Sequence, residues 1–178
     1  MKMPIAKVPL ALNARLPVDI RVMEAQKVRG SFHARFSARG KQYRYFVYNF
    51  HSLDPLLRRQ AWHVPRELNL VAMRAAATHF KGKRDYAAFA NNRNYEMEST
   101  VRTLHRCEIR KAGPLITFII EGDGFLYKMC RGIAGTIVQV GLGKFQPSDI
   151  AQMLEKKDRS LAGMTAPAHG LVLWKVFY

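Results

Sequence analysis

The sequence predicts an α+β fold in which helices pack on one face of an antiparallel or mixed sheet. Residues 43–48 alternate between two sets of side chains with a period of two, as a strand does, and residues 101–111 alternate again. Residues 125–142 repeat apolar side chains at steps of three and four, as a helix does. The elements follow in the order strands, helix, hairpin, helix, short helix and strand, which is typical of α+β proteins.

The first 30 residues predict too little structure for a domain of their own. Leu10–Asn13 indicates the end of a helix, Leu16–Pro17 a turn and Ile20–Val28 a strand. From Phe32 to Asn49 we expect a long pair of strands that turns at Arg39–Lys41, where a glycine supplies the turn.

The middle of the chain predicts a helix and a hairpin. In Asn69–Phe80 the apolar residues share one helical face, and Gly82 follows. Lys83–Ser99 is polar and is expected to be a loop. Val101–Lys111 and Leu115–Glu121 flank an Ala-Gly-Pro turn and predict the two strands of a hairpin.

The last third carries the clearest helix pattern, over Phe125–Leu142. Pro147 indicates the start of a short helix that runs through Lys156. Leu171–Tyr178 predicts a final strand. It is apolar on both faces except for Lys175, so we expect it to lie inside a sheet.

The charge balance favours a nucleic acid as partner. The 178 residues hold 29 Lys and Arg against 13 Asp and Glu, a formal net charge of +16. Such a charge attracts polyanions. At 48% apolar residues the chain can still bury a core, so the charge does not indicate disorder. Basic residues are spread along the chain among aromatic ones, which suits a folded surface that follows phosphates.

Several other classes of protein are disfavoured. No apolar run reaches the roughly 18 residues of a membrane span, and the N-terminal residues make a poor secretory signal. The two cysteines, Cys107 and Cys130, have no metal-ligand spacing, so we expect no metal site and a reducing, cytoplasmic setting. Gly122-Asp123-Gly124 lacks the third glycine of a dinucleotide fingerprint, and there is no Walker lysine. A metabolic enzyme with a small anionic substrate is therefore disfavoured.

Two features remain open from the residues alone. Arg131 stands one turn into an otherwise apolar helix. If it is buried, its permanent charge needs a carboxylate or phosphate partner; otherwise it lies on an exposed helix face. Tyr43 and Tyr45 share one strand face, where they can stack on bases or simply fill a sheet.

Three segments lead to a resemblance: Phe32–Ala38, Gly122–Gly135 and Thr165–Leu171. Together with Tyr43-Arg44-Tyr45, Arg102-Thr103 and the stretch from Lys157 to Ser160, taken in order, they resemble the tRNA pseudouridine synthase A (TruA) family. The resemblance covers essentially the whole chain. It implies a tRNA-processing isomerase that converts uridine to pseudouridine at positions 38 to 40 of the anticodon arm, uses no cofactor and usually works as a homodimer.

The resemblance also implies what this chain lacks. The family's attacking aspartate lies in a Gly-Arg-Thr-Asp-Ala-Gly-Val-His segment, upstream of everything matched here, and this sequence contains no such segment. We therefore expect residues 1–30 to be the tail of the N-terminal synthase domain and residues 31–178 to be the C-terminal, pseudouridine synthase-like domain. We expect the chain alone to be inactive.

The family's roles carry over to three residues whose motifs match. Tyr43 corresponds to the tyrosine that packs on the target base, Arg131 to the arginine that pairs with the aspartate, and Leu171 to the leucine of the uracil pocket. The basic concentration that runs from Arg35 through Lys41 to Arg44 is expected to bind RNA weakly. The alternative function is a non-catalytic, basic RNA-binding module whose family resemblance is a relic.

Overall fold

The computed structural model describes residues 3–91 and 99–178, in two compact units that comprise residues 1–37 and 38–178. The first unit holds a 3-10 turn, Ile5–Lys7, and the short helix α1, Val8–Asn13. The strand expected over Ile20–Val28 is wrong. The Asn13 side chain donates to the Val22 carbonyl at 2.8 Å and accepts from the Val22 N–H at 2.7 Å, so it occupies the backbone groups that a neighbouring strand would bind.

The strand pair expected over residues 32–49 is also only half correct. Ser37 N–H donates to the His33 carbonyl at 2.8 Å, and His33 N–H donates to the Ser37 hydroxyl at 3.0 Å. These two bonds close a turn where the first strand was expected. The second strand exists as β1, Gly40–Tyr48.

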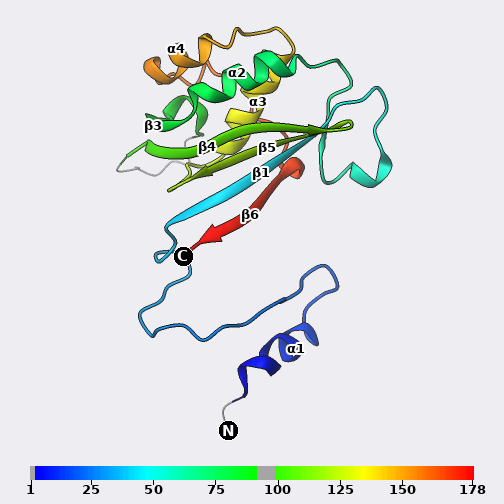
Figure 1. Ribbon diagram of the computed structural model, residues 1–178, viewed down its shortest axis with the longest axis vertical. Coiled ribbons are helices and arrows are strands. Elements are labelled where there is room, and N and C mark those ends of the chain that lie inside the picture. Colours follow the sequence, from blue (N-terminus) through cyan, green and yellow to red (C-terminus); the bar gives the residue numbers. More distant parts are fainter. Residues whose placement is uncertain (1–2, 92–98) are drawn as a thin grey trace. The chain divides into compact units, whose positions relative to one another are not determined.

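The second unit is built on a six-stranded mixed sheet, which confirms the α+β fold class (Figure 1). The strand order is β2-β1-β5-β4-β3, and β6 also pairs with β1. All pairs are antiparallel except β1 with β2. The other strands are β2 (Trp62–His63), β3 (Gly82–Asp85), β4 (Val101–Ala112), β5 (Leu115–Gly122) and β6 (Leu171–Phe177).

Three helices lie together over one face of this sheet (Figure 1). They are α2, Leu70–His79; α3, Met129–Gly141; and α4, Asp149–Lys156. All three were expected, and the expected hairpin is confirmed as β4 and β5. The core lies between the sheet and α3, which buries eleven of its thirteen residues. Short 3-10 turns add Pro55–Leu57, Ala87–Phe89 and Ala168–Gly170.

Three expectations for this unit need correction. The segment expected to be a loop over residues 83–99 contains β3 and a 3-10 turn; its residues 92–98 lie outside the described part. Helix α3 begins at Met129 rather than Phe125, because Lys128 adopts the left-handed conformation, with φ of 60°. Strand β6 is at an edge, paired with β1 alone among the described strands, and Trp174 within it is 51% exposed.

Candidate functional site

A cavity of about 290 Å³ opens between the sheet and the segment that leads into α3. Tyr43 of β1, Leu171 at the start of β6 and residues 125–130 line it. Leu171 lies close to Tyr43 because β6 runs antiparallel to β1 and pairs Leu171 with Tyr45. The structure thus brings together two of the three residues that the family resemblance singled out.

Tyr43 presents one aromatic wall of this cavity. Its ring meets Phe125 edge to face, with 4.9 Å between the ring centroids. Partial burial raises the pKa of Tyr43, and the nearby Cys130 adds to the effect. The hydroxyl therefore stays protonated at neutral pH. The two rings offer an apolar, uncharged surface of the kind on which a nucleobase stacks.

The turn into α3 forms the rest of the wall. Met129 N–H donates to the Leu126 carbonyl at 3.1 Å, and Gly132 N–H donates to the Lys128 carbonyl at 2.9 Å. The Lys128 ammonium lies 5.1 Å from the centroid of the Tyr127 ring. A non-glycine residue at positive φ is uncommon and clusters at functional sites. Phe125 and Lys128 were missed as site residues, because the apolar period assigned Phe125 to the helix and gave no sign of the left-handed turn.

Arg131 follows the cavity by one residue and is half-buried. Its Nε donates to the Ala166 carbonyl at 2.7 Å, and Ala166 N–H donates back to the Arg131 carbonyl at 3.0 Å. No carboxylate of a described residue lies within ion-pair distance of its guanidinium. Arg131 is therefore fixed in place by a carbonyl while its charge has no acidic partner in the part of the chain described.

Tyr45 has a structural role rather than a stacking one. It is wholly buried, and its hydroxyl donates to the Pro167 carbonyl at 2.7 Å. Burial raises the pKa of Tyr45, although the nearby charge of Arg131 acts in the opposite direction. This bond ties the segment before β6 to β1 and so fixes the approach to Leu171.

None of the three basic residues expected to contact RNA is among the residues that line the cavity. The Arg44 guanidinium packs over the Trp174 ring, 3.6 Å from its centroid, on the face of β1 opposite to Tyr43 and Tyr45. Lys41 lies near the start of the same strand. Arg35 belongs to the first unit, where it lies 5.5 Å from the centroid of the Phe36 ring.

Neither free cysteine offers a nucleophile. Both are buried; burial raises the pKa of Cys107 to about 12 and that of Cys130 well above its ordinary value. Among the residues described, no group of three or more His, Cys, Asp or Glu is placed to hold a metal ion. No helix in the described ranges is long and apolar enough to cross a membrane. What remains at the site is a cavity with aromatic walls, also lined by Lys128, and a fixed arginine beside it.

Comparison with known proteins assigns this chain to a family. A family model described as tRNA pseudouridine synthase matches residues 76–178. The chain is 46% identical over 178 residues to tRNA pseudouridine synthase A of Bacillus licheniformis, covering all of this chain and 72% of that protein. The corresponding proteins of Bacillus subtilis and an Exiguobacterium species are each 44% identical over the whole chain, which covers 72% and 71% of them. The chain belongs to the tRNA pseudouridine synthase family.

Proposed function

We propose that this chain is the portion of a tRNA pseudouridine synthase that holds the target uridine in the anticodon arm, at positions 38 to 40. The observation that carries the proposal is the cavity itself, where Tyr43 and Leu171 face one space in a member of this family. An enzyme that isomerises a base must take it out of the stack. The flipped base then needs aromatic and apolar walls in place of its lost neighbours.

Arg131 supports the charge requirement of that reaction. The family's attacking aspartate must stay ionised in a pocket, and a nearby opposite charge favours the ionised form. The half-buried guanidinium beside the cavity, without an acidic partner among the described residues, is suited to that task. Because this sequence has no Gly-Arg-Thr-Asp segment, we propose that the chain alone does not turn over RNA.

The test supplies the missing aspartate. The stretch of the Bacillus subtilis relative that precedes its match to this chain is fused ahead of residue 1, and tritium release from tRNA carrying 5-tritiated uridine is measured. The chain alone is expected to release none, and the fusion is expected to be active. Arg131→Met in the fusion should abolish release, whereas the matched exposed change Arg110→Met should leave it within about twofold. Release by the Arg131→Met fusion within a few-fold of the parent would sink the role given to Arg131.

The runner-up function is a non-catalytic RNA-binding module, which the +16 charge and the missing aspartate segment favour. Both functions expect tRNA binding that weakens steeply between about 50 and 200 mM salt, as neutralised phosphates require. Arg35, Lys41 and Arg44 are proposed to contribute to that weak binding. The fusion protein distinguishes the two functions. A fusion that binds tRNA but makes no pseudouridine would favour the RNA-binding module.

The remaining family properties are proposals as well. We propose a cytoplasmic homodimer that needs neither metal nor cofactor, as the family resemblance implies. Light scattering of the active fusion tests the dimer, and activity after exhaustive treatment with EDTA tests the metal. A monomeric active fusion, or loss of activity restored by a divalent cation, would contradict the respective point.

A further inference from the structure

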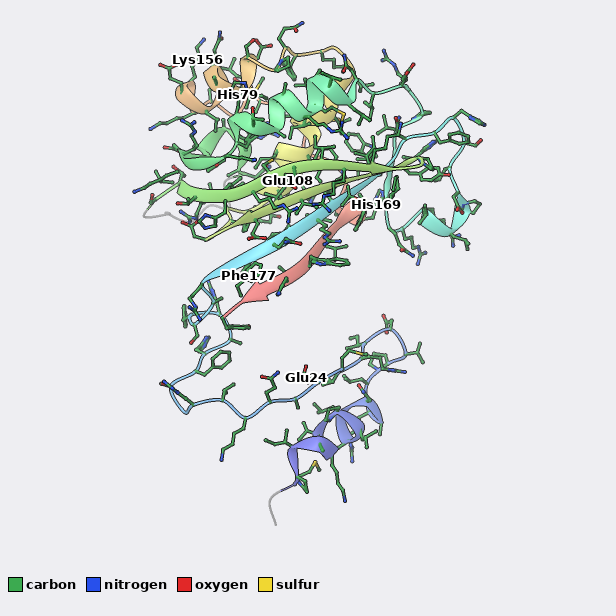
Figure 2. The ribbon with its side chains drawn as sticks, viewed as in Figure 1. Glu24, His79, Glu108, Lys156, His169 and Phe177 are labelled. Atoms are coloured by element: carbon green, nitrogen blue, oxygen red, sulfur yellow. The ribbon has the colours of Figure 1, made fainter. Side chains whose placement is uncertain are left out.

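The segment of residues 158–167, here called the strap, crosses α3 on the way from α4 to β6. It follows Lys156 at the end of α4 and leads to His169, just ahead of β6 (Figure 2). The strap contains no helix or strand, so side chains of α3 bind its backbone groups instead. Gly163 N–H, for example, donates to the Thr136 hydroxyl at 3.0 Å.

The strap lies directly on α3 and has little room to shift. Met164 N–H donates to the Gln139 side-chain oxygen at 2.9 Å. A Cβ on Gly135 would collide with the Met164 carbonyl oxygen, and a Cβ on Gly163 would lie 2.7 Å from the Thr136 Cα. Atoms packed this closely cannot move apart from one another. The path of the strap and the position of α3 are therefore set together.

The far end of the strap holds Arg131. Ala166 is wholly buried, and its carbonyl accepts from the Arg131 Nε at 2.7 Å. The next carbonyl, that of Pro167, accepts from the Tyr45 hydroxyl at 2.7 Å. The bond to Ala166 uses only Nε. It leaves the two terminal nitrogens of the guanidinium, which are the pair that can bind both oxygens of a carboxylate.

Arg159 closes the strap from within. Its Nη1 donates to the Gly163 carbonyl at 2.8 Å and to the Ala162 carbonyl at 3.3 Å, and its Nη2 donates to the Thr165 hydroxyl at 3.0 Å. Arg159 is half-buried, and no carboxylate of a described residue lies within ion-pair distance of it. Because a guanidinium is a rigid, planar fork, its bonds to three acceptors of one segment fix how that segment folds.

We propose that Arg159 is a positioning residue for the isomerisation: it sets the fold of the strap, and the strap sets where the Arg131 guanidinium lies. The inference rests on the proposed function, in which Arg131 pairs with the attacking aspartate. The link between the two arginines is short. Arg159 binds Thr165, and the next residue along the chain, Ala166, binds Arg131. Since Ala166 is wholly buried, a displacement of Thr165 is passed on to Arg131.

The first measurement follows Arg131 itself in the purified chain. Its Nε–H signal is identified in nitrogen NMR spectra by its absence from Arg131→Lys, and the exchange of that hydrogen with solvent is measured. Arg159→Gln should speed the exchange about tenfold, as expected when the hydrogen bond to Ala166 is lost. Tyr86→Phe is the matched destabilising control, because it deletes a buried hydroxyl that donates to the Phe80 carbonyl, and it should leave the exchange within about twofold.

The second measurement is the rate of tritium release by the active fusion. Arg159→Gln should lower kcat by roughly 10- to 100-fold, as a misplaced catalytic group does. KM for tRNA should stay within about twofold, because Arg131 is assigned to the reaction and not to binding. Arg159→Lys keeps the charge but not the fork, so it should not restore kcat. Ser160→Ala, an exposed neighbour whose hydroxyl binds only Asp158, should leave both constants unchanged.

Thr165→Val carries the same test if Arg159→Gln does not fold, because it removes the acceptor nearest Ala166 and leaves Arg159 in place. It should change the exchange and kcat in the same directions. The inference is overturned if both variants leave the Arg131 exchange unchanged, if Arg159→Lys is as active as the parent, or if only KM changes. A parent fusion that releases no tritium would overturn the proposed function, whereas an active parent with unaffected variants would overturn this inference alone.

Discussion

The two faces of β1 differ in what they require of a side chain. Tyr45 and Val47 point toward the helices and are wholly buried. On the opposite face Arg44 covers the Trp174 ring, and Gln42 donates from its amide to the Glu121 carboxylate at 2.7 Å. The first face tolerates only side chains whose shape fits the packed core. The second face is stabilised by polar and cation–π contacts between neighbouring strands. The helix-covered face therefore fixes the fold and carries the uridine pocket, whereas the other face depends less on exact shape.

Helix α3 should show the strictest requirement for shape, at Gly135. A Cβ there would collide with the Met164 carbonyl oxygen, which is backbone and cannot turn away. We expect Gly135→Ala to lower the free energy of unfolding by about 3 kcal/mol or more, in spite of the roughly 1 kcal/mol that alanine gains over glycine in a helix. Denaturant melts of the purified variants measure it.

The same helix supplies controls of graded severity. At Gly132 the added Cβ would collide with the Phe89 carbonyl oxygen, so Gly132→Ala should also be strongly destabilising. At Gly141 the nearest atoms, at 2.7 and 2.8 Å, belong to the Met73 side chain rather than to backbone, so Gly141→Ala should be less destabilising than the other two changes. A similar gain of stability at all three positions would show that helix propensity, and not close packing of α3, sets the tolerance of this face.

Tyr45→Phe tests how far the buried face positions the site. The change deletes the hydroxyl that donates to the Pro167 carbonyl and leaves that carbonyl without this partner. We expect a loss of about 1–2 kcal/mol of stability. Binding of an anticodon-arm RNA hairpin should weaken too, because the segment before Leu171 loses its hydrogen bond to β1. The matched change Tyr48→Phe lacks any such buried bond and should be close to neutral; if Tyr45→Phe is equally neutral, the tie to Pro167 is not what orders this segment.

An ion pair joins the end of α4 to the outer strand of the sheet and predicts a pH effect. The Lys157 ammonium lies 3.0 Å from the Asp85 carboxylate. Burial acts to raise the pKa of Asp85, but hydrogen bonds from Thr100, the Ala87 N–H and Lys157 outweigh it, so the pKa lies below its ordinary value. Asp85→Asn should cost about 1 kcal/mol at pH 7, since the asparagine oxygen can still accept from Ala87.

The sign follows from the lowered pKa. The contribution of Asp85 is present above the unfolded-state pKa of about 3.9 and is lost as the pH falls through the lower folded-state pKa. The stability gap between parent and Asp85→Asn should therefore close in acid. Lys157→Asn removes the partner charge while suiting the left-handed backbone at that position, where φ is 57°. If the gap persists unchanged below pH 3, the carboxylate charge is not its source.

The sequence predicted the elements that carry a long pattern. Helices α2 and α3 and the hairpin of β4 and β5 repeat apolar residues over ten or so positions, and tertiary packing agrees with those periods. Strand β3 was missed because its four residues, Gly82–Asp85, are polar and largely exposed. A polar strand of this kind forms because it pairs with β4 at the edge of the sheet. The apolar residues of β6 did not reveal that β1 would be its one partner among the described strands.

The site divides in a similar way. The convergence of Tyr43 and Leu171 comes from pairing across more than a hundred residues, and only the family resemblance anticipated it. The left-handed turn at Lys128 has no sequence signal, because glycine or asparagine would be the usual residue there. In the sequence, Arg59 is one basic residue among many. In the structure it lines a cavity formed by four separate segments that meet at the end of the sheet, and no local pattern predicts that meeting.

The smallest effect is expected on the uncovered face, at the pair of Arg106 and Glu108. Their charged atoms lie 2.7 Å apart, but the side chains are 30% and 39% exposed. The hydrogen bond from Arg106 lowers the pKa of Glu108, so the pair's contribution is present at neutral pH and is lost in acid. Solvent screening keeps the contribution small, and Glu108→Gln should cost less than about 0.5 kcal/mol, less again in 1 M salt. Arg110→Gln, whose charge lies 3.8 Å from Glu108 on a side chain 67% exposed, should cost still less. A loss from Glu108→Gln comparable to that of Gly135→Ala in denaturant melts would mean that the uncovered face also fixes the fold, and the contrast between the two faces would fail.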